Sequence, residues 1–173
     1  MLKKAREMDP EGDYRLITEG DFSQFQDASY DLVLSAFTFD NIPTMEKKVI
    51  NFKELARLLK PKGRLVNLVS SPEIYTHEWA SFSTKDYPEN RQAKSGDKVW
   101  IIQTDTEDKR PVKDVVWTHE SYLETYERAE LELIKIHRPL AKRSEPFQWI
   151  NETKIAPWII YVLKKTENFD KST

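Results

Sequence analysis

The feature that most constrains the fold is a strand–helix–strand pattern in the middle of the chain. Residues 30–37 (Tyr-Asp-Leu-Val-Leu-Ser-Ala-Phe) form an apolar run of strand length, typical of a strand covered on both faces in a parallel sheet. Apolar residues then recur at helical spacing from Val49 to Leu59, after Thr44 as a helix N-cap. Lys60-Pro61-Lys62-Gly63 ends that helix, and residues 64–69 form the next strand. These tight connections predict a βαβ unit and an α/β fold.

Weaker patterns flank this unit. A short helix is predicted over residues 1–8 and a strand over 14–18. After the unit we expect a helix over 72–82, a polar loop or lid over 83–98, a hairpin of strands 99–104 and 112–117, a helix capped by Thr118, and strands over 131–137 and 158–163. The last two strands have no helix between them. This order predicts an antiparallel pair at one edge of an otherwise parallel sheet.

Composition excludes several classes of function. The 173 residues fit one domain, and a formal charge of −2 gives no reason to expect nucleic acid as a partner. No apolar run approaches the roughly 18 residues of a membrane span, and no signal peptide follows Met1. The absence of cysteine excludes disulfides and thiolate chemistry, and together these features predict a cytoplasmic protein. His77-Glu78 and His119-Glu120 lack the spacing of metal ligands, so no metal site is expected.

Three short motifs, in this order, resemble class I S-adenosylmethionine (SAM) dependent methyltransferases. They are Gly20-Asp21-Phe22, the strand that begins Tyr30-Asp31-Leu32-Val33, and Leu59-Lys60-Pro61-Lys62-Gly63. The family's fold is a Rossmann-like sheet that ends in an antiparallel hairpin. The resemblance implies such a sheet lacking its first two strands, because the family's Gly-x-Gly loop is absent. Residues 1–165 would form the partial domain, with 84–117 as a lid and hairpin insertion and 166–173 as a charged tail.

The resemblance also implies a cofactor site for SAM. In the family, an acid at the position of Asp21 bonds the adenine amino group, and the next residue, Phe22, flanks the ring. Ser35, Ala36 and Phe37 would line the sulfonium side. The alternatives are a turn aspartate with a core phenylalanine for the first pair, and ordinary strand core for Phe37.

Acceptor-side residues are expected in two places. Asp40 and Asn41 follow the strand that ends at Phe37, where a carboxylate can take a proton from an acceptor. The alternative is a helix-entry turn. The second place is an aromatic and ionisable cluster, in which His77 is a candidate base and the substrate candidates are Tyr75, Glu78 and Trp79. A packed surface helix is the alternative there.

Two functions remain open from the sequence. The first is a SAM-dependent methyltransferase of a small-molecule acceptor, whose missing half is supplied from elsewhere. The second is a non-catalytic methyltransferase-like binding or regulatory module, favoured by the missing loop because a Cβ blocks the backbone approach to the cofactor. Without the first two strands, the strand at Tyr30 has an unpaired apolar edge. Either a homodimer covers that edge, or residues 14–18 collapse onto it.

Overall fold

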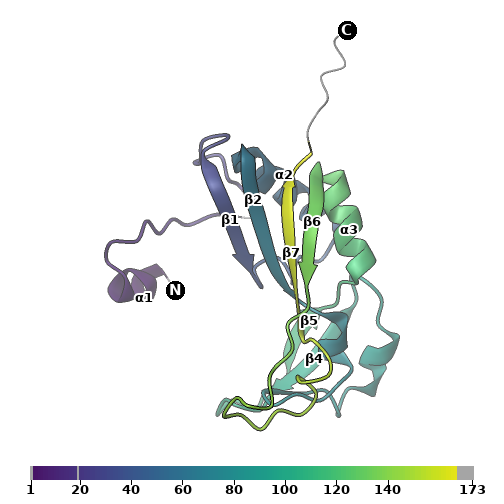
Figure 1. The fold of residues 1–173 in the computed structure, drawn as a ribbon. Helices are drawn as coiled ribbons and strands as arrows, with labels where there is room; N and C mark the ends of the chain where they lie inside the picture. Colours follow the sequence, from purple (N-terminus) through teal and green to yellow (C-terminus); the bar gives the residue numbers. More distant parts are fainter. Residues whose placement is uncertain (1, 19, 167–173) are drawn as a thin grey trace.

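The computed structural model describes residues 2–18 and 20–166 and has the α/β architecture expected from the sequence. Its main sheet has the order β1-β2-β7-β6, formed by β1 (Tyr30–Ala36), β2 (Leu59–Ser70), β7 (Trp158–Lys165) and β6 (Leu131–His137). β1 and β2 are parallel, whereas β7 runs antiparallel to both of its neighbours (Figure 1). The antiparallel pair predicted from residues 131–163 is therefore confirmed.

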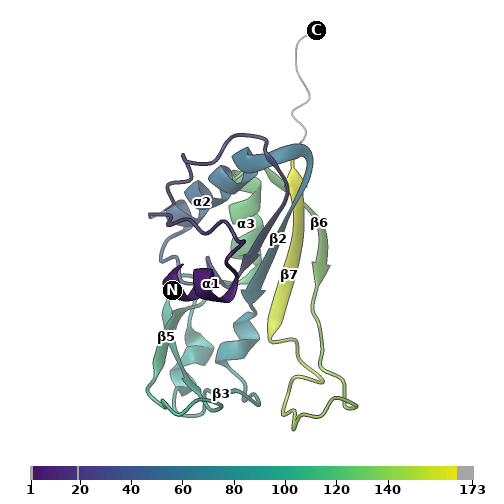
Figure 2. The same ribbon diagram turned by 90° about the vertical axis from the view of Figure 1, so that its left-hand side faces the viewer.

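Two helices cover one face of this sheet (Figure 2). α2 (Met45–Leu58) begins after Thr44, whose hydroxyl accepts a hydrogen bond from the backbone N–H of Lys47 at 3.3 Å. α3 (His119–Arg128) begins in the same way after Thr118. Both caps match the sequence prediction, because a threonine oxygen satisfies a backbone donor that the first helical turn leaves unpaired. The apolar core beneath the helices includes Phe52, Leu55, Leu65, Val69, Tyr122, Tyr126, Ile159, Tyr161 and Leu163.

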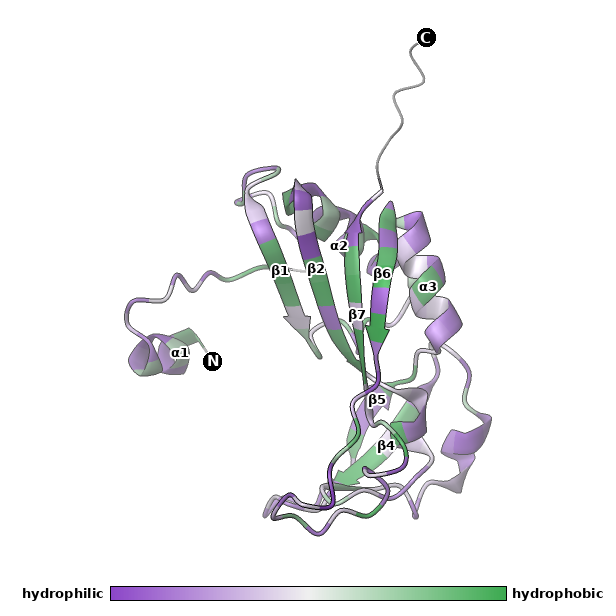
Figure 3. Cartoon of the chain, viewed as in Figure 1, coloured by the Kyte–Doolittle hydropathy of each residue, from purple (hydrophilic) through white to green (hydrophobic). Residues whose placement is uncertain are grey.

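The opposite face of the sheet carries no helix among residues 2–18 and 20–166 (Figure 2). Leu32 and Leu34 of β1 point to this open face with 57% and 68% of their surface exposed. The residues of β2 and β7 on the same face, which are Val66, Leu68, Ile160 and Val162, are only half-buried. Figure 3 shows this face with extended hydrophobic stretches along the strands. β1 is also an edge strand, since β2 is its one partner in the described structure.

β2 starts earlier than predicted. It follows α2 directly at Leu59 and contains the Lys-Pro-Lys-Gly segment expected to separate helix from strand. Gly63 lies against β1, where an added Cβ would come within 2.9 Å of the Tyr30 carbonyl oxygen. The glycine therefore permits β1 and β2 to approach each other at this point.

Residues 72–117 form a second, smaller unit below the sheet, here called the lobe. It contains the 3₁₀ helices η1 (Pro72–Tyr75) and η2 (Pro88–Gln92) and the antiparallel strands β3 (Phe82–Ser83), β4 (Lys98–Gln103) and β5 (Val112–Val115). The β4–β5 hairpin confirms the sequence prediction. The lobe has its own apolar core, which consists of Ile74, Tyr75, Trp79, Val99, Ile101 and Val116.

The helix predicted over residues 72–82 is wrong. Only η1 is helical, because the indole N–H of Trp79 donates to the Ile74 carbonyl at 2.9 Å and occupies an acceptor that a continuing helix would use. The loop predicted over residues 83–98 also contains local structure, namely η2.

The N-terminal segment leaves the body of the molecule. α1 (Leu2–Met8) matches the predicted helix but has no buried residue and lies apart from the sheet (Figure 1). Residues 14–18 form no strand, so that prediction is wrong, and they do not pair with β1. The backbone there has no neighbouring strand with which to form a ladder. Of the predicted charged tail, residues 167–173 lie outside the described part.

Candidate functional site

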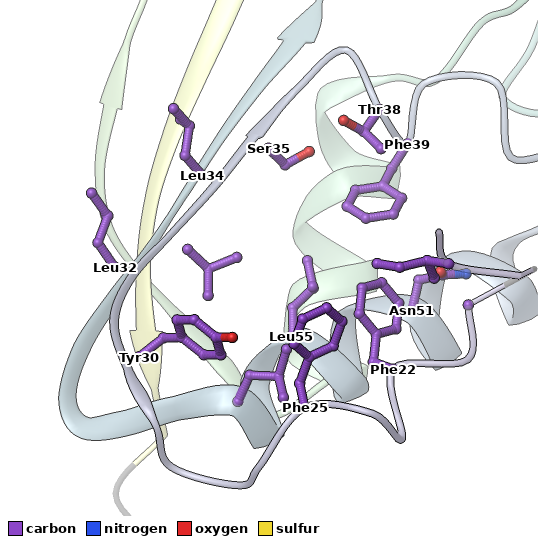
Figure 4. Close-up of a pocket in the computed structure, with 14 residues that line it drawn as sticks. Phe22, Phe25, Tyr30, Leu32, Leu34, Ser35, Thr38, Phe39, Asn51 and Leu55 are labelled. Atoms are coloured by element: carbon purple, nitrogen blue, oxygen red, sulfur yellow. The ribbon is translucent and has the colours of Figure 1, made fainter. Parts of the chain in front are cut away.

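A cavity of about 500 Å³ lies beside the free edge of β1 (Figure 4). β1 forms one wall, and α2 together with Ile17 and residues 20–25 forms the other. None of its fourteen lining residues is charged: Ile17, Gly20, Phe22, Phe25, Tyr30, Leu32, Val33, Leu34, Ser35, Thr38, Phe39, Asn51, Leu55 and Leu58. Such a surface suits a flat apolar ligand, because burial of apolar area is its main source of affinity.

Ser35 gives this cavity a buried polar atom. The residue is 3% exposed, and its hydroxyl has no hydrogen-bond partner in the described structure. It lies opposite Asn67 of β2, whose side-chain oxygen is likewise unpartnered. A buried polar atom without a partner costs about 1–3 kcal/mol, so this pair of oxygens is a place where a donor from a ligand or a water would be stabilised.

The Gly20–Phe22 segment forms one end of the cavity. Gly20 has φ +78°, and a Cβ there would come within 2.8 Å of the Asn51 side-chain oxygen. Phe22 is 7% exposed and lines the cavity. Asp21 does not line it: its carboxylate is exposed and accepts from the backbone N–H of Ser23 at 2.9 Å, and bonds from Ser23 hold the pKa of Asp21 below its usual value. The structure therefore brings Phe22 and Ser35 together and leaves Asp21 at the surface beside them.

The end of β1 turns away from the cavity. Ala36 is exposed, and Phe37 adopts a left-handed backbone conformation with φ +55°. That conformation is strained for a bulky residue. The Phe37 backbone N–H donates to Leu68, and its ring packs edge-on against Trp158 at 4.8 Å. Phe37 thus faces the junction between the sheet and the lobe.

Asp40 and Asn41 occupy different environments. Asn41 is exposed. Asp40 is 4% exposed, and its carboxylate accepts from the Ser70 backbone N–H at 2.9 Å and from the Tyr122 hydroxyl at 3.0 Å. Burial raises the pKa of Asp40 against the opposing effect of these bonds. These bonds join the ends of β1 and β2 to α3, so Asp40 holds the loop after β1 in place.

Lys48 completes this arrangement and was not identified from the sequence. Its side chain is fully buried, and the ammonium donates to the Phe39 carbonyl at 2.7 Å and to the Tyr122 hydroxyl at 3.2 Å. It also lies 4.4 Å and 4.6 Å from the ring centroids of Tyr122 and Trp117. Burial lowers the pKa of Lys48 to about 7, with Asp40 opposing the shift. The sequence feature that could have identified Lys48 is its position on the face of α2 that the helical spacing assigns to the core.

The second predicted cluster lies in the lobe. Tyr75 is 2% exposed, and its hydroxyl donates to Asp114 at 2.9 Å. Burial and the Asp114 carboxylate raise the pKa of Tyr75. Trp79 is equally buried, so both rings belong to the lobe core. His77 and Glu78 are half-buried and line a cavity at the lobe surface together with Tyr75.

Among the described residues, no three acidic or histidine side chains are grouped as metal ligands would be. Nor does this part of the chain contain a helix long and apolar enough to cross a bilayer.

Comparison with known proteins places the fold. Residues 1–67 match the family model of the methyltransferase domain. No curated protein matches the chain at the sequence level.

Solved structures resemble the chain over almost its whole length. SAM-dependent methyltransferases from Methanosarcina mazei and Mesorhizobium loti superpose with TM-scores of 0.62 and 0.64 at 12% and 14% identity, each over 95% of this chain. The CcbJ methyltransferase of Streptomyces caelestis gives 0.61 at 14% identity over 96% of this chain. The chain covers 77%, 76% and 75% of these three proteins, respectively. At such identities the likeness establishes the fold.

Proposed function

We propose, from the class I SAM-dependent methyltransferase fold of this chain, that it takes part in methyl transfer from SAM to a small-molecule acceptor. The observation that carries the proposal is the sheet order β1-β2-β7-β6, with parallel β1 and β2 and antiparallel β7. Residues 1–67, which include the loop before β1, also match the methyltransferase domain. In open α/β sheets, ligands bind beyond the carboxyl ends of the parallel strands.

The residues beside β1 fit the adenine end of SAM. The uncharged cavity offers Phe22 as an aromatic wall and the Ser35 hydroxyl as a buried polar atom, and the exposed carboxylate of Asp21 precedes Phe22 in the chain. An aromatic ring contributes about 1–3 kcal/mol to the binding of a stacked base. Asp21 and Phe22 would hold and orient the base, whereas Ser35 keeps the place on the sulfonium side that the family resemblance implies.

The same residues do not fit the methionine end. That end carries an ammonium and a carboxylate, and no residue that lines the cavity is charged. The chain has four glycines, none arranged as Gly-x-Gly. The residues that line the cavity therefore offer no charged partner to the methionine end, and their proposed part is to hold and orient the base.

Acceptor binding is assigned to the lobe and to the loop after β1. Phe37 and Trp158 lie between the two regions, and the Phe82 ring of the lobe is 6.2 Å from that of Trp158. His77 at the lobe surface and Asn41 after β1 are the candidates for proton transfer and acceptor contact. Asp40 positions the loop, because both of its carboxylate oxygens accept bonds from other elements.

The alternative is a non-catalytic binding module. The uncharged cavity and the unpaired edge of β1 favour it for this polypeptide on its own, because neither requires a bound cofactor.

Calorimetric titration with adenosine and with SAM separates the two functions. We expect both ligands to bind the chain with matching affinities, because only the adenine end has partners. Asp21→Asn, at an exposed residue, and Phe22→Leu should each weaken both ligands. Phe147→Leu is the control, since Phe147 is 63% exposed and does not line the cavity. If adenosine gives no heat, the methyltransferase proposal fails for this chain and the binding module is retained.

A homodimer is the proposed cover for the β1 edge. Antiparallel pairing of β1 with a second β1 about Val33 would place Leu32 opposite the partner's Leu34, and Asp31 opposite the partner's Ser35. No like charges then face each other, and both exposed leucines gain an apolar neighbour.

A further inference from the structure

A second cavity, on the surface of the lobe, has the features of a ligand site. Its volume is about 260 Å³, and it is lined by residues of three separate segments, 75–78, 84–91 and Asn151. In contrast to the cavity beside β1, it carries charged groups, namely Glu78, Lys85 and Arg91, together with His77.

The backbone around this cavity is held by side chains whose hydrogen bonds are already used. The Thr84 hydroxyl donates to the His77 carbonyl at 3.0 Å, and the Asn151 amide donates to the Glu78 carbonyl at 2.8 Å. The buried Asn90 donates to the Tyr75 carbonyl at 3.1 Å. The cavity is therefore preorganised, since its shape does not depend on a ligand to pair these groups.

The tautomer of His77 follows from its neighbours. Its Nδ1 lies 3.1 Å from the Glu73 carbonyl oxygen and 3.0 Å from the Thr76 hydroxyl. A carbonyl oxygen can only accept, so Nδ1 carries the hydrogen and donates it. Nε2 is then the ring nitrogen that can accept a proton or, once protonated, donate to a ligand.

Two cationic side chains border the cavity without a carboxylate partner. Lys85 and Arg91 are exposed, and neither forms an ion pair with any residue in 2–18 or 20–166. Glu78 is engaged within the lobe: burial would raise its pKa, but bonds such as that from the Thr84 N–H at 2.6 Å outweigh this and lower it. Two cations and one carboxylate leave the cavity with a net charge of +1 while His77 is neutral.

We propose that this cavity binds an anionic oxygen group of the acceptor, a carboxylate or a phosphate, through Lys85 and Arg91. Arginine presents paired donors that match either group, and lysine adds a point charge. The inference rests on the proposed methyltransferase function, because it names the class of acceptor that function would use.

The position of the cavity agrees with an elongated acceptor. It shares Glu78 and Lys85 with a neighbouring cavity of about 460 Å³, which is also lined by Phe82. Phe82 contacts Trp158, and Trp158 contacts Phe37 at the end of β1. An acceptor with its anionic end at Arg91 would extend along these aromatic rings toward the sheet.

The test is a titration of the ¹⁵N-labelled chain with inorganic phosphate and, separately, with succinate at constant ionic strength, followed by NMR. We expect saturable shifts of the His77, Thr84 and Arg91 signals. The Lys85→Gln/Arg91→Gln double variant should bind at least tenfold more weakly, as expected for the loss of charged hydrogen bonds. The Lys113→Gln/Arg143→Gln variant is the control, because both of these residues are exposed and outside the cavity.

The two probes distinguish the two chemistries. Tighter phosphate binding assigns a phosphoryl acceptor, and tighter succinate binding assigns a carboxylate acceptor. Shifts that do not saturate with either probe, or that persist unchanged in the double variant, overturn the proposal. Adenosine binding is measured at the separate cavity beside β1. A failure of anion binding at the lobe therefore does not decide the test of the methyltransferase function.

Discussion

At the scale of single residues, Lys48 is buried among several partners that stabilise its side chain. Its ammonium lies between two aromatic rings and donates to Phe39 and Tyr122, while Asp40 shares the Tyr122 hydroxyl. A cation near an aromatic ring that is shielded from water is stabilised by about 2 kcal/mol. These contacts offset only part of the cost of removing the charge from water, because the pKa of Lys48 is still lowered to about 7.

Lys48→Met should lower the free energy of unfolding by about 3–5 kcal/mol, because it leaves Asp40 buried without its cation. Urea denaturation measures this change. Lys47→Met is a matched control at an exposed neighbouring position, and its expected effect is within about 0.5 kcal/mol. A Lys48→Met variant as stable as the control would show that the ammonium is not a partner of Asp40.

The same residue predicts a pH dependence. The pKa of Lys48 is about 7 in the folded chain and about 10.4 when unfolded, so between these values the unfolded state binds the additional proton. The free energy of unfolding should therefore rise with pH, by up to about 1.4 kcal/mol per unit between roughly pH 7.5 and 9.5. Asp40 has a raised pKa in the folded chain, so its contribution to the free energy of unfolding is lost as pH rises through that pKa.

Denaturation of the wild type and of Lys48→Met across this interval isolates the effect. The variant should show a flatter profile. Equal slopes in the two proteins would contradict the assignment of the titration to Lys48.

At the scale of elements, Asn90 joins the parts of the lobe. Its amide donates to the carbonyls of Tyr75 and Trp100, and its oxygen accepts from the Trp100 N–H. η1, η2 and β4 are thereby connected by one buried side chain that is 5% exposed.

Asn90→Ala should destabilise the lobe by about 2–4 kcal/mol, because it leaves buried backbone groups of η1 and β4 unpaired. Hydrogen–deuterium exchange should show faster exchange at β4 and η1, with β2 and β7 unchanged. Gln92→Ala, at an exposed position of η2, is the control. Equal acceleration in the sheet would mean that the lobe and the sheet open together.

Elements with strong local signals were predictable from the sequence. α2 and α3 have threonine caps and apolar spacing, and β6, β7 and the β4–β5 hairpin have continuous strand patterns. The helix expected over residues 72–82 failed because its aromatic residues were assigned to a helical face, whereas Tyr75 and Trp79 pack inward as a lobe core. Residues 14–18 have strand propensity but no neighbouring strand with which to pair. The local sequence does not determine whether such a neighbour is present.

The candidate site was predictable in part for the same reason. Gly20, Phe22 and Ser35 were identified through motifs and lie on one cavity. Asp40 was expected to face an acceptor, but contacts with Tyr122, 82 residues away, and Lys48 bury it. The spacing of apolar residues along the sequence does not predict contacts between residues so far apart.

At the scale of the whole molecule, the free edge of β1 is the basis of the proposed homodimer. An apolar edge strand is a template for pairing with another strand, and Asp31 is the one charged residue of β1. Leu32 and Leu34 extend this apolar edge onto the open face of the sheet.

Leu34→Lys should therefore shift the chain from dimer to monomer in sedimentation velocity experiments at micromolar concentration, because a buried lysine opposes the pairing. Ile50→Lys is the control, since Ile50 is 58% exposed on α2, away from the edge. A wild-type chain that sediments as a compact monomer would remove the dimer proposal.

The two apolar cores of the molecule share no buried residue, although Val115 belongs to one and Val116 to the other. Val115, the last residue of β5, and Val116, which follows it, thus face separate interiors. Substitutions within the core of the lobe should therefore disturb the sheet core little, except at Val115 and Trp117, which lie in the lobe but pack with the sheet. Under the proposed function, the lobe that binds the acceptor can therefore vary in sequence while the core of the sheet is retained.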